Sequence, residues 1–166
     1  TFIVRPHFCL ERRVKNFFTM VKHVEDKINL ENDTKIALVR FILVVEDSPM
    51  YYSRYLPLLY QAVLEQTTRI INDVSTDDLY KVLKLRARPK ILLATNYDEA
   101  IDIFNRYSDY LFCLITDVKF NKGGEVAETA GFDLVKFLRS KKKEIPVIIQ
   151  SSNSEHAHEA HNLKVT

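Results

Sequence analysis

Short apolar runs alternate along the chain with longer segments in which apolar residues recur at helical spacing. Four of these runs are apolar at every position and end at turn-forming or acidic residues, which is typical of buried strands in a parallel sheet. They cover residues 41–45, 91–94, 111–115 and 147–149. The alternation of strands with helical segments predicts a doubly wound α/β fold, in which helices cover both faces of a parallel sheet.

Helical periodicity predicts the elements that connect these strands. The expected helices cover residues 49–71, 77–85, 97–107, 132–142 and 154–163. Ser48 and Pro49 suit the N-cap and the first position of the first of them. The stretch between the first two strands is long enough for two helices, so the first crossover is expected to carry an extra helix. Residues 118–130 are expected to form a polar loop before the next helix.

Composition narrows the class of protein. The 166 residues are 46% hydrophobic, enough for one domain with a buried core. The formal net charge of +2 gives no electrostatic footprint for nucleic acid or an anionic membrane. The longest apolar run contains Arg40, so no membrane-spanning helix is expected. Cys9 and Cys113 are too few for a disulfide framework and, with no signal peptide visible, they favour a cytoplasmic protein.

Polar residues follow the predicted strands at their carboxyl ends, the edge at which open parallel sheets bind ligands. Glu46 and Asp47 follow the first strand, Asp117 follows the third, and Ser151 with Ser152 follows the fourth. Three carboxylates at one edge repel one another unless a cation joins them, and their oxygen atoms suit Mg²⁺. Alternatively, Asp47 caps a helix and Asp117 only ends a strand, which explains each residue alone more easily than all of them together.

Three segments resemble signatures of the response-regulator receiver domain. They are residues 44–48 (VVEDS), 114–117 (LITD) and 146–151 (PVIIQS). Their order, spacing and flanking apolar runs agree with that family over residues 40–166. The resemblance implies a flavodoxin-like receiver fold. It also implies a signalling module rather than an enzyme, with no catalysis beyond its own phosphorylation and slow dephosphorylation.

The resemblance also implies a role for each candidate residue. Asp117 accepts a phosphoryl group, Asp47 binds Mg²⁺ directly, and Glu46 assists through water. The backbone carbonyl of Lys119 is a further ligand of the metal, and Ser151 is the switch hydroxyl that responds to phosphorylation. The implied partners are a sensor histidine kinase or phosphotransfer protein as phosphoryl donor, a downstream effector or fused domain, and a second copy in a homodimer.

The chain departs from the receiver pattern in its domain organisation. Residues 35–166 are expected to form a receiver that ends before its fifth strand, where the family carries a lysine. Residues 1–34 resemble the last strand and helix of a receiver, with Arg5 and Pro6 in place of Lys and Pro. They are either the tail of an upstream receiver or a permuted completion of this sheet. The two insertions, in the first crossover and at residues 118–130, resemble a receiver subtype joined to phosphoenolpyruvate synthase-like proteins.

Two other functions fit parts of the same pattern. A pseudo-receiver would use the fold as a phosphorylation-independent interaction module, which the missing lysine favours and the intact acidic residues disfavour. An aspartate-nucleophile phosphatase of the haloacid dehalogenase type would need a second aspartate two residues after the nucleophile, where this chain has Lys119. Three histidines of the last predicted helix, His156, His158 and His161, are expected to form an exposed helix face rather than a metal site.

Overall fold

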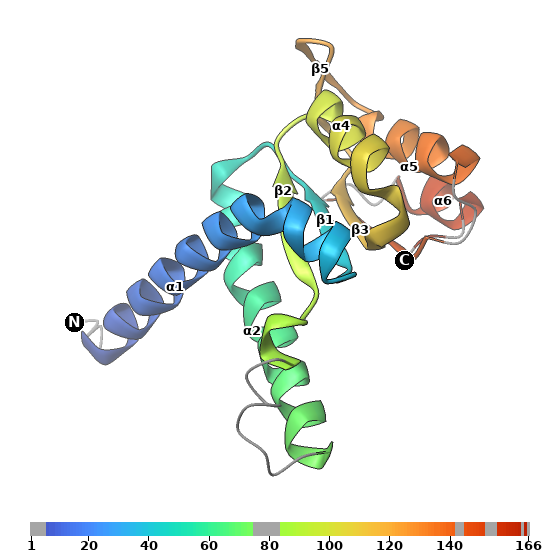
Figure 1. Cartoon of the computed structure of the whole chain (residues 1–166). Coiled ribbons are helices and arrows are strands. Elements are labelled where there is room, and N and C mark those ends of the chain that lie inside the picture. The colour runs from blue at the N-terminus through green and yellow to red at the C-terminus, as the bar shows by residue number, and fades with distance from the viewer. Residues whose placement is uncertain (1–5, 75–83, 142–144, 152–155, 164, 166) are drawn as a thin grey trace, which may run out of the picture.

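Four parallel strands form the centre of the computed structural model, which describes residues 6–74, 84–141, 145–151, 156–163 and 165 (Figure 1). The strands are β1 (Phe41–Val45), β2 (Lys90–Ala94), β3 (Leu111–Asp117) and β6 (Val147–Gln150). They lie in the order β2-β1-β3-β6, which is the order of the first four strands of a flavodoxin-like sheet. Each strand contains one of the four predicted apolar runs, so the sequence-based strands are confirmed.

Helices cover both faces of this sheet, which confirms the doubly wound architecture. On one face α2 (Pro49–Val74) packs Leu56 and Tyr60 against Ile42 and Val44 of the central strand β1. On the other face the larger core includes buried side chains of α4 (Tyr97–Tyr107) and α5 (Ala130–Lys141). All five residues of β1 are buried because its side chains alternate between these two cores.

The register of the strands brings their carboxyl ends to the same edge. Val45 of β1 is paired with Ala94 of β2 and with Thr116 of β3. Asp117 in turn is paired with Gln150 of β6. The residues that follow β1, β3 and β6 are therefore neighbours in space, although they are far apart in the sequence.

Helix α1 (Pro6–Glu31) lies against the outer edge of β2 and ends in a π-helical turn at Asn32–Ile36. The Asp26 carboxylate accepts a hydrogen bond from the Ile91 amide at 3.0 Å, and Lys90 forms an ion pair with Asp33 at 3.1 Å. The Ile91 amide belongs to an edge strand, so Asp26 supplies a partner that the sheet does not. These contacts involve the C-terminal half of α1 and the turn that follows it. The N-terminal half of α1 extends away from the sheet (Figure 1).

The predicted helices agree with the described residues at most positions. The helix expected within residues 1–34 begins at Pro6, the segment predicted at 97–107 is α4, and the last helix is α6 (His156–Asn162). The extra helix predicted at 77–85 lies outside the described residues except for residues 84 and 85, which are helical. The strand predicted at the N-terminus, with Arg5, also lies outside them, as does Ser152. No described helix is both long and apolar enough to cross a membrane.

The predicted polar loop at 118–130 is wrong, because part of it is a β-hairpin. Strands β4 (Phe120–Lys122) and β5 (Glu125–Ala127) pair in antiparallel fashion. The two residues between them, Gly123 and Gly124, have φ angles of 63° and 93°, and a two-residue turn of this kind requires positive φ at both positions. The fully buried ring of Phe120 fixes the hairpin to the core. The Gly123-Gly124 pair is typical of a hairpin turn, but the polar composition of the segment favoured its interpretation as a loop.

Candidate functional site

A cavity of about 400 Å³ opens at the carboxyl edge of the sheet. Its lining includes three of the residues predicted from the sequence: Glu46 after β1, Asp117 at the end of β3, and Ser151 after β6. The remaining lining residues are Tyr51, Tyr55, Ile149 and Gln150. The structure therefore brings together residues from three strands at the edge where open α/β sheets bind ligands.

Glu46 is the most buried acidic residue of the site, with only 3% of its surface exposed. Its amide donates to the Ala94 carbonyl, and its Oε1 accepts a hydrogen bond from the Ser48 amide at 3.0 Å. Burial raises the pKa of Glu46, and the charges of Asp117 and Asp47 raise it further, against the opposing hydrogen bond from Ser48. The hydrogen bond from Ser48 thus holds the Glu46 carboxylate at the start of α2, but this bond does not offset the effects of burial and of the neighbouring negative charges on its pKa.

Asp117 is half-buried, and two opposing influences act on its carboxyl group. Burial raises the pKa of Asp117, and the negative charge of Asp47 adds to this effect. The backbone amides of Val118 and Lys119 donate hydrogen bonds to the carboxylate and lower its pKa. These amides favour the ionised form of Asp117, which is the form that can act as a nucleophile or as a metal ligand.

Gly131, near the start of α5, allows the helix to approach the strand end. A Cβ atom at this position would lie 2.1 Å from the Asp117 carbonyl oxygen and 3.0 Å from the Val118 Cα. The Gly131 amide donates to the Val118 carbonyl at 2.9 Å. The backbone that carries Asp117 is therefore fixed by direct contact with α5, which only a glycine permits.

The other two predicted metal ligands, Asp47 and Lys119, are not among the residues that line the cavity. Asp47 is partly exposed and is not among the residues that line the cavity, although its charge acts on both Glu46 and Asp117. Lys119 donates its amide to Asp117, while its ammonium group pairs with Glu128. The role of the Lys119 carbonyl as a metal ligand stays a prediction.

Ser151 forms its side-chain contact with a residue that the sequence placed on an exposed helix face. Its hydroxyl oxygen lies 2.8 Å from Nδ1 of His156, the first residue of α6. The His156 ring meets the buried Phe132 ring edge to face, with centroids 5.7 Å apart. A positive charge on His156 lowers the pKa of Asp117. The packing of α6 on Phe132 brings His156 to the site, and no sequence signal distinguished it from His158 and His161.

Two tyrosines of α2 form the aromatic wall of the cavity. Tyr51 and Tyr55 stack at 6.4 Å between ring centroids, with their planes 12° apart. Burial raises the pKa of Tyr55, and the charges of Glu46 and Asp117 add to the rise. Both tyrosines belong to the helix predicted at 49–71, but their place at the acidic site was not predicted from the sequence.

The chemistry of the acidic residues fits Mg²⁺. The charges of Asp117 and Asp47 raise the pKa of Glu46, and the charge of Asp47 raises the pKa of Asp117, which is the repulsion between carboxylates that a divalent cation relieves. Within the described part of the chain, no three side chains of His, Cys, Asp or Glu are grouped as a metal site. Mg²⁺ commonly binds through one or two carboxylates and several waters, so an open site of this kind suits it better than a closed cage of side chains.

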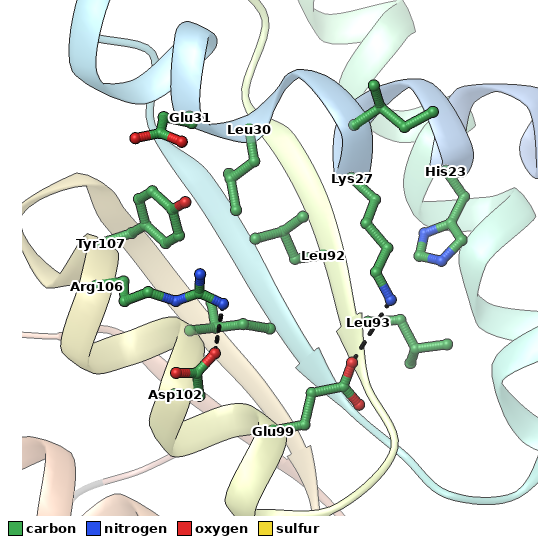
Figure 2. A pocket seen from close by; sticks show the side chains of 12 residues that line it. His23, Lys27, Leu30, Glu31, Leu92, Leu93, Glu99, Asp102, Arg106 and Tyr107 are labelled. Carbon is green, nitrogen blue, oxygen red and sulfur yellow. Dashed lines mark hydrogen bonds and ion pairs between the residues drawn. The ribbon is translucent and has the colours of Figure 1, made fainter.

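A second cavity, of about 310 Å³, lies between α1 and α4 above β2 (Figure 2). Lys27 of α1 and Glu99 of α4 pair across the cavity at 3.7 Å, while Arg106 pairs with Asp102 one turn away on α4 itself. Burial lowers the pKa of His23, and the charge of Lys27 lowers it further. The buried Nδ1 of His23 has no hydrogen-bond partner in the described structure. None of the residues predicted from the sequence lines this cavity.

Comparisons with known proteins give a distant structural match. No protein-family model matches the chain, and no curated protein is similar to it by sequence. A crystal structure of a response regulator receiver domain protein from Clostridium thermocellum is similar, with a TM-score of 0.46 and 17% sequence identity. The similarity covers 76% of this chain and 75% of that chain. Many unrelated functions use one architecture, so function must be argued from the site itself.

Proposed function

We propose that this chain is a receiver domain of two-component signalling that accepts a phosphoryl group on Asp117. The observation that carries the proposal is the convergence of Glu46, Asp117 and Ser151 from three strands on one cavity. An acidic pair to bind the metal, a nucleophilic aspartate and a hydroxyl at one sheet edge are the groups that the proposed phosphoryl transfer to a carboxylate would use.

In the proposed reaction an Asp117 oxygen attacks the phosphorus atom of a phosphohistidine or an acyl phosphate. The bond from phosphorus to the donor breaks as the bond to Asp117 forms, so the donor leaves with the electron pair. The amides of Val118 and Lys119 hold the carboxylate during the attack. Bound Mg²⁺ neutralises the charge of the phosphoryl oxygens and of the acidic residues. Asp47, Glu46 with a water molecule, Asp117 and the Lys119 carbonyl are the proposed ligands.

Ser151 is the proposed switch. Its hydroxyl is bonded to His156, and a phosphoryl group on Asp117 offers oxygen atoms that accept a stronger, charge-assisted hydrogen bond. Moving the hydroxyl from His156 to the phosphoryl group alters the contact between β6 and α6.

The proposed donor is a sensor histidine kinase or a phosphotransfer protein, and the proposed target is an effector or a fused domain. We place the chain in the subtype joined to phosphoenolpyruvate synthase-like proteins, since the hairpin β4–β5 accounts for one of its two insertions.

The test is incubation of the chain with acetyl phosphate and Mg²⁺, followed by intact-mass spectrometry. The wild type is expected to gain one phosphoryl group, and Asp117→Asn is expected to gain none. Asp109→Asn, at an exposed aspartate near the start of β3, is the matched control and should react like the wild type. A wild type that binds neither acetyl phosphate nor beryllofluoride in the presence of Mg²⁺ contradicts the proposal.

A pseudo-receiver is the second candidate, favoured by one specific observation. The Lys119 ammonium group, which is near Asp117 in the sequence, is paired with Glu128 on the hairpin side of the site. A module that works by interaction alone gives the same mass before and after acetyl phosphate. An aspartate-nucleophile phosphatase differs from both because it releases inorganic phosphate over many turnovers, which a phosphate-release assay measures.

A further inference from the structure

Helix α1 carries a row of apolar side chains that the described part of the protein leaves uncovered. Val14, Phe17, Val21, Val24 and Ile28 are between 47% and 75% exposed, and Ile28 has the highest value. The row begins at Val14 and Phe17, on the N-terminal half of α1 that extends away from the sheet (Figure 1), and it continues into the C-terminal half. We call this row the α1 stripe. A contiguous apolar patch of this length on a water-facing helix marks an interaction surface.

The α1 stripe lies on the side of the helix opposite to the contacts with the sheet. From residue 14 onward, where the side chains of α1 are described, the buried residues are Thr19, Asp26 and Leu30, and Asp26 bonds to the edge strand β2. Val21, Val24 and Ile28 are each displaced from a buried residue by two positions, which corresponds to roughly 200° around an α-helix. Docking of α1 on its own sheet therefore cannot cover the stripe, because the two faces point in opposite directions.

The spacing of the α1 stripe is that of a coiled coil. Its residues follow one another at intervals of three, four, three and four, which places them at alternating d and a positions of a heptad repeat. The a positions are Val14, Val21 and Ile28, all of which are β-branched. Val or Ile at a favours two parallel helices when Leu occupies d, and here the d positions are Phe17 and Val24. A globular surface helix would instead show the wider 3.6-residue pattern facing its own core.

We propose that the α1 stripe binds the α1 stripe of a second copy of this chain, as a parallel two-stranded coiled coil. With Met20 and Phe18 beside the row, seven exposed apolar side chains of roughly 100 Å² each give about 700 Å² per helix. Specific interfaces bury about 600–1,000 Å² per partner, and the area of the exposed side chains on α1 lies in the lower part of that range. The same face on both copies also makes the contact self-complementary, as a two-fold dimer requires.

The charges that flank the stripe permit this arrangement. In a parallel pair the g position of one helix faces the following e position of the other. Met20 would face Glu25 of the second copy, and Lys27 would face Asn32, so like charges do not meet there. Within each protomer, Glu25 is already paired with Lys22 at 2.7 Å, and Lys27 with Glu99 at 3.7 Å. The seam is therefore apolar, with its neighbouring charges neutralised.

The first test is sedimentation velocity of the full chain over a concentration series from about 1 to 100 μM. The wild type is expected to form a dimer. Val21→Glu, which places a charge at the central a position, is expected to weaken the dimer by about 100-fold or more because two carboxylates would be buried together. Asn29→Glu, on an exposed position of the same helix outside the stripe, is the matched control and should leave the dimer unchanged. Circular dichroism checks that each variant is folded.

The second test places a cysteine at the same a position, in a chain with Cys9→Ser and Cys113→Ser. Val21→Cys is expected to form an interchain disulfide under mild oxidation, because identical a positions face each other only in a parallel, in-register pair. Asn29→Cys should not form one. A monomeric wild type at 100 μM, or a dimer that Val21→Glu does not weaken, overturns the proposal and assigns the stripe to a different partner or the dimer to a different face. Neither result depends on phosphorylation of Asp117.

Discussion

The carboxylate of Asp26 and the guanidinium of Arg88 form a buried, two-point ion pair. Asp26 Oδ1 lies 2.8 Å from Arg88 Nη2, and Oδ2 lies 3.1 Å from Nη1. The two side chains are 0% and 3% exposed. The same carboxylate accepts hydrogen bonds from the Tyr60 hydroxyl and the Ile91 amide. One residue of α1 thus joins this helix to α2, to the segment before β2 and to the edge of the sheet.

The first prediction is that Asp26→Asn destabilises the protein by about 3–5 kcal/mol, the range observed when one partner of a buried ion pair is removed. The amide leaves the Arg88 charge uncompensated in a site without water access. Urea denaturation followed by circular dichroism measures the change. Asp102→Asn removes the exposed pair with Arg106, whose side chains are 58% and 60% exposed, and should cost less than about 1 kcal/mol. Equal effects of the two variants would mean that α1 does not hold the β2 edge.

The second prediction concerns Gly131. Gly131→Ala puts a Cβ atom 2.1 Å from a backbone oxygen that cannot move without moving Asp117. We expect a loss of roughly 2–4 kcal/mol in the free energy of unfolding, in the range of a severe steric clash in a core. We also expect a lower rate of phosphorylation by acetyl phosphate, although the carboxylate itself is intact. Gly124→Ala tests strain without a clash, because this position has positive φ and open space, and it should cost only about 1 kcal/mol with no effect on phosphorylation.

The strands and most helices could be predicted because their signals are local. Four apolar runs and four helical periodicities fixed the elements, and the order of polar residues at the strand ends located Glu46, Asp117 and Ser151 in one cavity. The hairpin at 120–127 was missed because its strands are short and polar, so that only the Gly123-Gly124 pair and the buried Phe120 indicated it.

The rest of the site depends on packing between elements that are distant in the sequence. Such contacts cannot be predicted from the residue pattern of one sequence. His156 is one of three similar histidines, and only the contact of α6 with Phe132 selects it. Tyr51 and Tyr55 are on the same helix as the core residues Leu56 and Tyr60, and only the packing of α2 on the sheet shows that they line the cavity. The buried network of Asp26, Arg88 and Tyr60 joins three segments whose contacts have no sequence motif.

The third prediction is that the acidic site lowers the stability of the protein at neutral pH. The pKa of Asp117 is raised from its ordinary value of 3.8 by burial and by Asp47. Above 3.8 the native state binds more protons than the unfolded state, so this group contributes stability at low pH that is lost as the pH rises through the raised value. Asp117→Asn keeps the hydrogen bonds from the Val118 and Lys119 amides but has no charge. We expect it to be more stable than the wild type by about 1 kcal/mol at pH 7 and equal to it below pH 3.8.

Mg²⁺ should offset the same destabilisation in the wild type. At ten times its dissociation constant, a ligand that binds only the native state stabilises it by about 1.4 kcal/mol. Thermal unfolding with MgCl₂, compared with NaCl at equal ionic strength, measures this effect. Asp117→Asn should show little of it, because the variant lacks both the ligand and the charge that the cation neutralises. An equal gain in the two proteins would show that Mg²⁺ acts elsewhere.

The fourth prediction concerns the reactivity of Cys113 on β3. The thiol is free, and burial raises its pKa to about 11. Only the thiolate reacts with iodoacetamide, so in a Cys9→Ser chain the rate of alkylation should be slow at pH 8 and rise about tenfold per pH unit toward pH 11. In denaturant the same thiol should titrate near its ordinary value, about 8.5, because desolvation is the sole cause of the shift. A native profile that levels off near 8.5 would mean that water reaches β3 on the α2 side of the sheet, and α2 would then not cover that strand as described.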